Sequence, residues 1–139
     1  MLKGEKSPEA AAETAPAPKR LIFPVQERLK GRDEIGEVFR GKRAVSRPGA
    51  KLFFIKNGLS HNRIAFTFSR KFGNAVERNR ARRLGREAYR NLRHEIRQGF
   101  DLVLLVYPAA SGAANDSFHT RFKQLGDLFR LAGLFNRIY

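Results

Sequence analysis

The residue types that commonly carry out catalysis are few and scattered in this chain of 139 residues. Its three histidines, His61, His94 and His119, do not have the His-x-x-x-His spacing that places two metal ligands on one helix. Glu34 and Glu37 could meet on one helix, but the helix dipole already explains acidic residues at a helix start. The sequence has no cluster of carboxylates of the kind that two-metal nucleases use. The sequence therefore predicts no catalytic residue and no metal site in the protein itself.

Basic residues, in contrast, are abundant in the chain. The formal net charge is +15 and the pI is about 11.2, above the value of about 9 that is typical of nucleic-acid-binding domains. A hydrophobic content of 42% with 12 phenylalanines indicates a folded body that carries this charge on its surface. The chain has no cysteine, which excludes disulfides and thiolate chemistry and fits a reducing cytoplasm.

Many of the basic residues fall in one stretch, SRKFGNAVERNRARRLGREAYR, from Ser69 to Arg90. Asn74, followed three residues later by Glu77, predicts a helix start, and the helix is expected to run from about Ala75 to Gln98. At about 100° per residue, apolar and basic side chains separate onto two faces. The apolar face holds Ala81, Leu84, Ala88, Tyr89, Leu92 and Ile96, and the adjacent arc holds Arg82, Arg83, Arg86, Arg90, Arg93 and Arg97.

This arc has two interpretations, a solvated helix face or a surface for a polyanion. A solvated face usually mixes charge signs, yet Glu77, Glu87 and Glu95 all lie outside the arc. Phosphates explain the pattern better, because guanidinium groups bind them bidentately and counterion release drives association. Asn79, in the same arc, adds a neutral hydrogen-bonding group. We therefore predict a nucleic-acid-binding helix.

Other elements must position this helix. RDEIGEVFRGKR predicts a short helix capped by Asp33 and followed by Gly41, with Ile35, Val38 and Phe39 on one face. AKLFFIKNG predicts a strand that ends in an Asn-Gly turn, and FDLVLLVY, apolar on both faces, predicts a central strand. A final helix is expected to begin near Asp116 or Ser117 and to repeat apolar residues up to Ala132.

The strand NRIAFTFS alternates between two kinds of side chain. Ile64, Phe66 and Phe68 share a core face, which leaves Thr67 and Ser69 on the other face. Either Phe53 or Phe54 of the neighbouring strand must also point away from that core, although both, like Phe39, can equally be core residues. Hydroxyl groups and an exposed aromatic ring suit single-stranded RNA.

The segment FTFSRKFGNAVERNRARRLGREAY resembles the signature of the bacterial ribonuclease P protein component. The run Arg78-Asn79-Arg80 follows shortly after Gly73 to Val76, and RLKGRDEIGEVFRGKR, KLFFIK and FDLVLLVYPAA occur in the matching order. The resemblance covers roughly residues 28 to 132. Gly85 departs from it, because a bulkier apolar residue is common there and glycine costs about 1 kcal/mol in helix propensity.

The resemblance implies an α/β sandwich of the α+β type over residues 21–139. This single domain is expected to have a mixed four-stranded sheet, three helices and a left-handed strand-helix-strand crossover, against the right-handed rule that holds in about 98% of cases. Residues 1–20, rich in Ala, Pro and Glu, lie outside the resemblance and are expected to form a disordered extension without a secretion signal.

The family acts with a catalytic RNA that removes the 5′ leader of precursor tRNA by hydrolysing one phosphodiester bond. The resemblance implies a heterodimer of one RNA and one protein, with Mg²⁺ held mainly by the RNA and none bound by the protein alone. The chain has no apolar run of about 18 residues that would span a membrane. We expect a soluble, cytoplasmic protein.

Two sets of site residues follow from matching this chain to the family. The expected contacts to the catalytic RNA are Asn74, Arg78, Asn79, Arg80, Arg82, Arg83, Arg86 and Arg90. The expected cleft for the precursor's leader is lined by Ile35, Phe39, Phe54, Thr67, Ser69, Arg70 and Lys71. Ile35 stands where an aromatic residue is common, so stacking is lost there.

Two other classes of protein remain as alternatives. A basic ribosomal or other structural RNA-binding protein would share the charge and size, and would co-sediment with ribosomal subunits. A stand-alone nuclease would cleave RNA without an RNA partner, and the scattered acids and histidines argue against it.

Overall fold

The structure, a computed structural model, describes residues 23–108 and 117–136. The expected disordered extension at residues 1–20 lies outside these ranges. The elements in chain order are η1 (Val25–Glu27), α1 (Arg32–Arg40), β2 (Ala44–Arg47), β3 (Ala50–Lys56), β4 (Arg63–Phe68), α2 (Ala75–Leu92), β5 (Phe100–Val106) and α3 (Phe118–Leu131).

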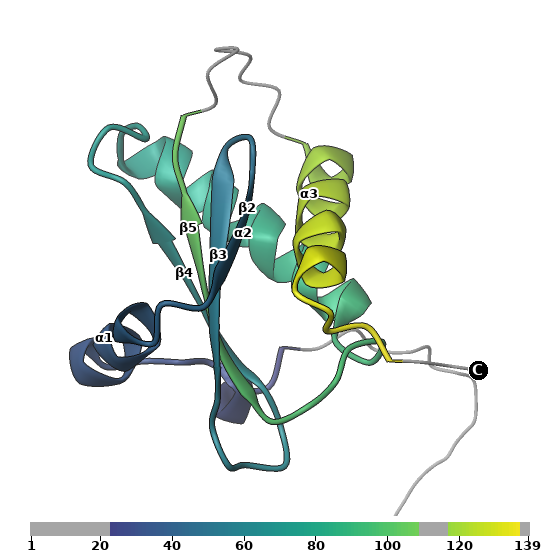
Figure 1. Cartoon of the computed structure of the whole chain (residues 1–139). Coiled ribbons are helices and arrows are strands. Elements are labelled where there is room, and N and C mark those ends of the chain that lie inside the picture. The colour runs from purple at the N-terminus through teal and green to yellow at the C-terminus, as the bar shows by residue number, and fades with distance from the viewer. Residues whose placement is uncertain (1–22, 109–116, 137–139) are drawn as a thin grey trace, which may run out of the picture.

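The strands form one four-stranded sheet in the order β2-β3-β5-β4. The central strand β5 pairs antiparallel with β3 and parallel with β4, so the sheet is mixed. Figure 1 shows α1 on one face of the sheet and α2 and α3 on the other. Within the described ranges, the expected sandwich of three α-helices and a mixed four-stranded sheet is therefore confirmed.

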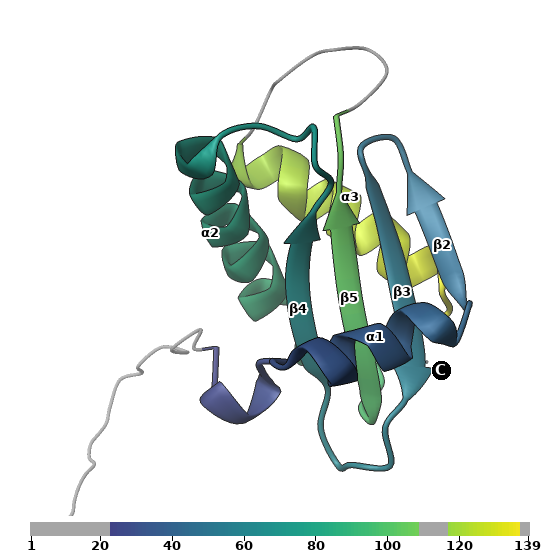
Figure 2. The ribbon, with the colours of Figure 1, turned by 90° about the vertical axis from the view of Figure 1, so that its left-hand side faces the viewer.

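The connection from β4 through α2 to β5 has the unusual hand. In Figure 2 α1 is in front of the sheet, both parallel strands point upward, and β5 lies to the right of β4. Helix α2 packs on the face away from α1 (Figure 1), which is the rear face in this view. A crossover behind the sheet that moves to the right is left-handed, which confirms the expectation from the resemblance.

Alternation along the strands produces two apolar cores. Leu52, Phe54 and Ile64 point to the larger core, between the sheet and helices α2 and α3. Ala65 and Val103 point to the smaller core, which α1 covers. The predicted alternation in β4 and the two-sided burial of β5 are both confirmed.

The residues at the two ends of α1 do not play the roles that the sequence predicted. Asp33 is not the cap: Gly31, with φ of 92°, precedes the helix, no side chain caps it, and Asp33 lies in the first turn. Gly41 does follow the helix, but with helical φ and ψ angles. Its small size matters because a Cβ there would overlap Ile55. Lys42 takes the positive φ, 60°, that a glycine usually adopts.

Helix α2 ends at Leu92, six residues before the predicted end at Gln98. The chain then turns to meet the segment after α3: the Arg97 amide donates to the Leu134 carbonyl at 2.6 Å, and Ile96 forms a β-bridge with Phe135. These long-range bonds replace helical ones. The start of α3 is as predicted, with the Ser117 hydroxyl accepting from the Thr120 amide at 3.1 Å.

Candidate nucleic-acid interface

The start of α2 is fixed by the two residues that predicted it. Asn74 Oδ1 accepts from the Glu77 amide at 2.9 Å, and Glu77 Oε1 accepts from the Asn74 amide at 2.9 Å. This reciprocal capping box confirms the predicted helix start. The side chain of Asn74 therefore caps the N-terminus of α2.

The turn from β4 into α2 is held by Arg78. Its Nε donates to the Gly73 carbonyl at 3.0 Å, and its Nη2 donates to the Ser69 and Arg70 carbonyls at 3.0 and 3.1 Å. Arg78 therefore clamps the connection that precedes the helix. Arg70 and Lys71 are exposed in this turn.

The outward face of α2 forms one side of an open groove of about 500 Å³. We call this the arginine groove, and its lining residues are Phe23, Arg28, Asn79, Arg82, Arg83, Arg86 and Arg90. Five of the eight residues expected to bind the catalytic RNA are brought together here. Arg80 is exposed on α2 but is not among the lining residues.

None of the residues that line the arginine groove is acidic. Burial, and then the charges of Arg28, Arg82 and Arg90, lower the pKa of Arg86 from its ordinary value. Arg82 is oriented twice: its guanidinium lies 5.2 Å from the centre of the Phe68 ring, and its Nη1 donates to Asn79 Oδ1 at 2.7 Å. The groove is thus a set of mutually repelling cations on an ordered scaffold.

The predicted arc of six arginines is shorter than expected. Arg93 turns away to form an ion pair with buried Glu27, and Arg97 lies beyond the helix end. Both would lie in the arc only if the helix continued to Gln98.

The second expected site lies on the sheet face that carries α1. Figure 2 shows α1 crossing this face near the start of β4 and β5, which leaves the half near their arrowheads without a described element over it. We call the whole of this face, which α1 covers at one end only, the open sheet face. Ile35 and Phe39 from α1 pack against its lower part, where the Phe39 and Phe53 rings meet edge to face at 4.7 Å.

Phe54 is not on the open sheet face, contrary to the prediction. It is only 6% exposed and lies in the larger core. The alternation of β3 sends Leu52 and Phe54 toward α2 and α3, so Phe53 takes the position assigned to Phe54.

Polar groups of the open sheet face lie farther along β4. Thr67 Oγ1 donates to the Leu104 carbonyl at 3.1 Å, whereas Ser69 Oγ, fully shielded from solvent, has no hydrogen-bond partner within the described residues. Strand register places Leu105 and Lys51 in the same row as Thr67. The sequence prediction missed these two residues, although assigning Phe53 outward would have placed Lys51, two residues earlier, on the same face.

Comparison with known proteins decides between the alternatives. A protein-family model described as Ribonuclease P matches residues 23–130. The chain belongs to the ribonuclease P protein family. The ribonuclease P protein component of Caldanaerobacter subterraneus subsp. tengcongensis is 32% identical over 108 residues, covering 78% of this chain and 90% of that protein. That of Clostridium botulinum is 32% identical over 113 residues, covering 80% of this chain and 98% of that protein.

Solved structures agree with this family assignment. The ribonuclease P protein from Thermotoga maritima superimposes with a TM-score of 0.66 at 29% identity, covering 75% of this chain and 96% of that chain. A ribonuclease P protein from Staphylococcus aureus, at 22% identity and a TM-score of 0.68, shares the fold over 79% of this chain and 98% of that chain. The chain is therefore a protein component of ribonuclease P, an endoribonuclease that processes tRNA.

Two features of this ribonuclease P protein were not predicted from its sequence. Gly85 is buried beneath Phe66, whose ring would lie 2.9 Å from an added Cβ, so the β4 side chain occupies the space of the bulk expected on the helix. Phe23 and Arg28 join the arginine groove from outside α2. No local periodicity marks them, because they flank a segment of only three helical residues.

Within the described residues, no group of three histidine, cysteine, aspartate or glutamate side chains is arranged to hold a metal ion. The same part of the chain contains no helix with the length and hydrophobicity needed to cross a bilayer.

Proposed function

We propose that this ribonuclease P protein binds the RNA subunit of the enzyme through the arginine groove. The observation that carries the proposal is that five arginines converge on one groove that has no acidic residue in its lining. They are Arg28, Arg82, Arg83, Arg86 and Arg90. Binding of RNA phosphates would relieve the repulsion among these guanidinium groups and release counterions. A ribose-phosphate backbone therefore fits the groove chemically.

Asn74, Arg78 and Asn79 have a supporting role in this proposal. Their side chains cap α2, clamp the turn before it and orient Arg82, respectively. They act by fixing the geometry in which the arginines meet phosphates. Arg80 adds a further exposed cation on the same helix.

We also propose that the open sheet face binds the 5′ leader of precursor tRNA as an extended strand. Lys51, Arg70 and Lys71 supply exposed cations around this face, and the partly exposed Thr67 supplies a hydroxyl oxygen that can still accept a hydrogen bond. The Phe39 and Phe53 rings pack on each other, and both residues are partly exposed, so they are available for contact with a base. A phosphate-rich single strand matches this combination.

Hydrolysis, in this proposal, is the work of the RNA subunit, with Mg²⁺ held mainly by RNA and one protein bound per RNA in the cytoplasm. The distribution of histidines supports this division. His61 lies between β3 and β4, His94 follows α2, and His119 is in the first turn of α3, and none of them is among the residues that line the arginine groove.

Reconstitution tests the proposal directly. The chain, purified free of RNA, is incubated with precursor tRNA and Mg²⁺, with and without the ribonuclease P RNA transcribed from the same genome. Leader removal is expected only when both subunits are present at modest Mg²⁺. Cleavage by the RNA-free protein at the same site would contradict the assignment of catalysis to RNA. Sequencing the RNA that copurifies with the chain checks the partner independently.

A further inference from the structure

The arginine groove has a second wall that does not come from α2. Phe23 and Arg28, on either side of η1, line it opposite the helix residues. The Arg28 guanidinium lies 5.2 Å from the centre of the Phe23 ring, and that of Arg86 lies 6.0 Å from the same centre. Phe23 as a whole is only 8% exposed, so its ring supports two cations and has little surface left for stacking on a base.

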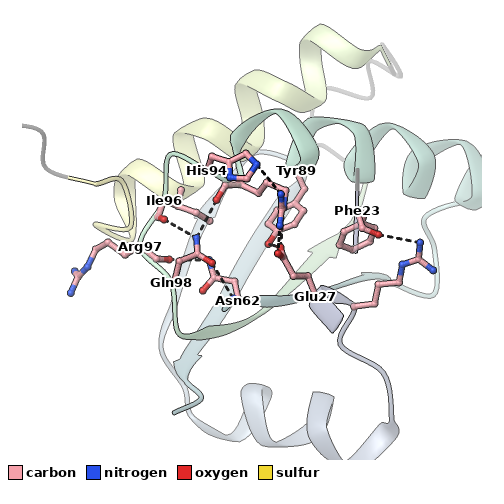
Figure 3. A network of polar contacts seen from close by, with 10 residues as sticks. Phe23, Glu27, Asn62, Tyr89, His94, Ile96, Arg97 and Gln98 are labelled. Carbon is pink, nitrogen blue, oxygen red and sulfur yellow. Dashed lines mark hydrogen bonds and ion pairs between the residues drawn. The ribbon is translucent and has the colours of Figure 1, made fainter. Parts of the chain in front are cut away.

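This second wall is anchored to the body of the protein by a buried carboxylate. Glu27, 3% exposed, accepts hydrogen bonds from the Tyr89 hydroxyl at 2.7 Å and from Arg93 Nε at 3.1 Å, and it forms an ion pair with Arg93. We call these three residues the Glu27 cluster. Figure 3 shows Glu27 and Tyr89 pointing toward each other, with Phe23 beside them.

Three further contacts fix the same segment. The Leu29 amide donates to the Ile64 carbonyl at 3.0 Å, and Arg28 forms a parallel β-bridge with Ile64 at the edge of β4. Phe23 packs edge to face on Tyr89 with ring centres 5.4 Å apart. The segment Phe23–Leu29 is therefore attached to both β4 and α2.

The Glu27 cluster also separates charges. Glu27 adjoins Arg28 in sequence, yet its carboxylate is turned inward and neutralised by Arg93. Arg28 is left facing the cationic groove, where its charge acts on Arg86. A segment that needed only to be held in place would not require a cation at this position.

We propose that the segment Phe23–Leu29 is a second RNA-binding wall, in which Arg28 contacts a phosphate and Glu27 is the positioning residue that holds Arg28 over the groove. The ligand is the ribose-phosphate backbone of the RNA subunit, because the buried Phe23 ring leaves charge as the means of recognition. This inference rests on the proposed function of the arginine groove and extends it beyond α2.

The first test measures the salt dependence of binding between the full chain and its transcribed ribonuclease P RNA. Arg28→Ala should lower the slope of log affinity against log salt by about 0.7 to 0.9, the value for one phosphate contact. Lys56→Ala, which removes an exposed cation at the end of β3, should leave the slope unchanged. An unchanged slope for folded Arg28→Ala would overturn the second wall.

Including Arg86→Ala separates this inference from the proposed function. If Arg86→Ala lowers the slope and Arg28→Ala does not, the groove binds RNA but the second wall does not contribute. If neither changes the slope, the proposed function of the groove fails as well. Melting curves establish that each variant is folded.

The positioning role of Glu27 is tested by a double-mutant cycle. In the Glu27→Gln background, which keeps the shape of the side chain but removes its charge, Arg28→Ala should have a much smaller effect on the salt slope than in the natural chain. Tyr89→Phe, which leaves the ion pair in place, serves as the milder variant if Glu27→Gln does not fold. An equal effect of Arg28→Ala in all folded backgrounds would show that the Glu27 cluster does not position Arg28.

Discussion

At the scale of single residues, the surroundings of each arginine in and near α2 decide what it can do. Arg78 donates hydrogen bonds to backbone carbonyls, and Arg93 pairs with a buried carboxylate. Arg86 lies in a groove where other cations surround it. Only the last kind gains strongly from a phosphate ligand, because it has repulsion to relieve. The type of residue and its helical position do not distinguish these three roles.

Replacing Arg82, Arg86 and Arg90 together by alanine should weaken binding of the RNA subunit far more than it weakens folding. Each lost phosphate contact should lower the salt slope by about 0.7 to 0.9. Arg40→Ala, at an exposed surface pair with Glu37, is the matched control and should keep the natural slope. A triple variant with normal melting and an unchanged slope would make the groove a merely solvated surface.

Gly85→Ala should destabilise the protein, although alanine favours a helix by about 1 kcal/mol over glycine. The added methyl would lie 2.9 Å from the Phe66 ring, and overpacking of this kind costs about 1 to 3 kcal/mol. Gly126→Ala in α3 is the control, since nothing lies within 4 Å of its added Cβ, and it should gain up to about 1 kcal/mol. Urea denaturation measures both; a stabilised Gly85→Ala would show that Phe66 moves aside freely.

At the scale of elements, the Glu27 cluster joins a short N-terminal segment to the end of the long helix. Burial by itself would raise the pKa of Glu27, but hydrogen bonds from Arg93 and Tyr89, the charge of Arg93 and that of His61 lower it below its ordinary value of 4.5. A carboxylate with a lowered pKa stabilises the folded state fully above its unfolded pKa. This stabilisation is lost as the pH falls through the lower folded-state pKa.

Glu27→Gln should therefore lower the free energy of unfolding by about 3 kcal/mol near neutral pH, as expected when a buried charge loses its partner. The difference from the natural chain should shrink below about pH 4.5, where the natural carboxyl also becomes protonated. Denaturant melts across pH 3 to 8 check this. A difference that stays constant over this range would mean that the charge of Glu27 contributes nothing.

How far the sequence predicts an element depends on the range of its contacts. The start of α2 was predictable because Asn74 and Glu77 satisfy each other's backbone amides within one turn. Its end was not, because Arg97 and Ile96 bond to residues that follow α3. Phe23 and Arg28 escaped prediction for the same reason, since only their contacts with α2 and β4 bring them to the groove.

At the scale of the whole molecule, the arginine groove and the open sheet face involve opposite sides of one sheet. The groove is built on α2, which packs on one face of the sheet, and the proposed leader site lies on the face that α1 half covers (Figures 1 and 2). One rigid body thus presents two basic surfaces in a fixed relation. If both bind RNA, the protein fixes the position of the precursor's leader relative to the RNA subunit.

Thr67→Val and Lys51→Ala should weaken binding of precursor tRNA by the holoenzyme while leaving the affinity for mature tRNA nearly unchanged, because the mature product has no leader. Phe54→Ala is the contrasting variant: it removes a core ring and should cost about 3 to 5 kcal/mol of stability. Binding and melting are measured on the same preparations. Equal losses for precursor and mature tRNA in folded Thr67 and Lys51 variants would count against a leader site.

The strand order also has a consequence for how the chain is made. β5 occupies the slot between β3 and β4, so these two earlier strands have no direct pairing to form before β5 exists. The last residue of β4 is Phe68 and the first of β5 is Phe100, an interval that a ribosome covers in about 2 to 6 s at 5 to 20 residues per second. Because α2 lies within this interval, it leaves the ribosome after β4 and before β5, without a completed sheet to pack on. The nascent chain therefore displays its arginines before it has the groove that arranges them, and binding to the RNA subunit in its native geometry must wait until β5 has left the ribosome and joined the sheet.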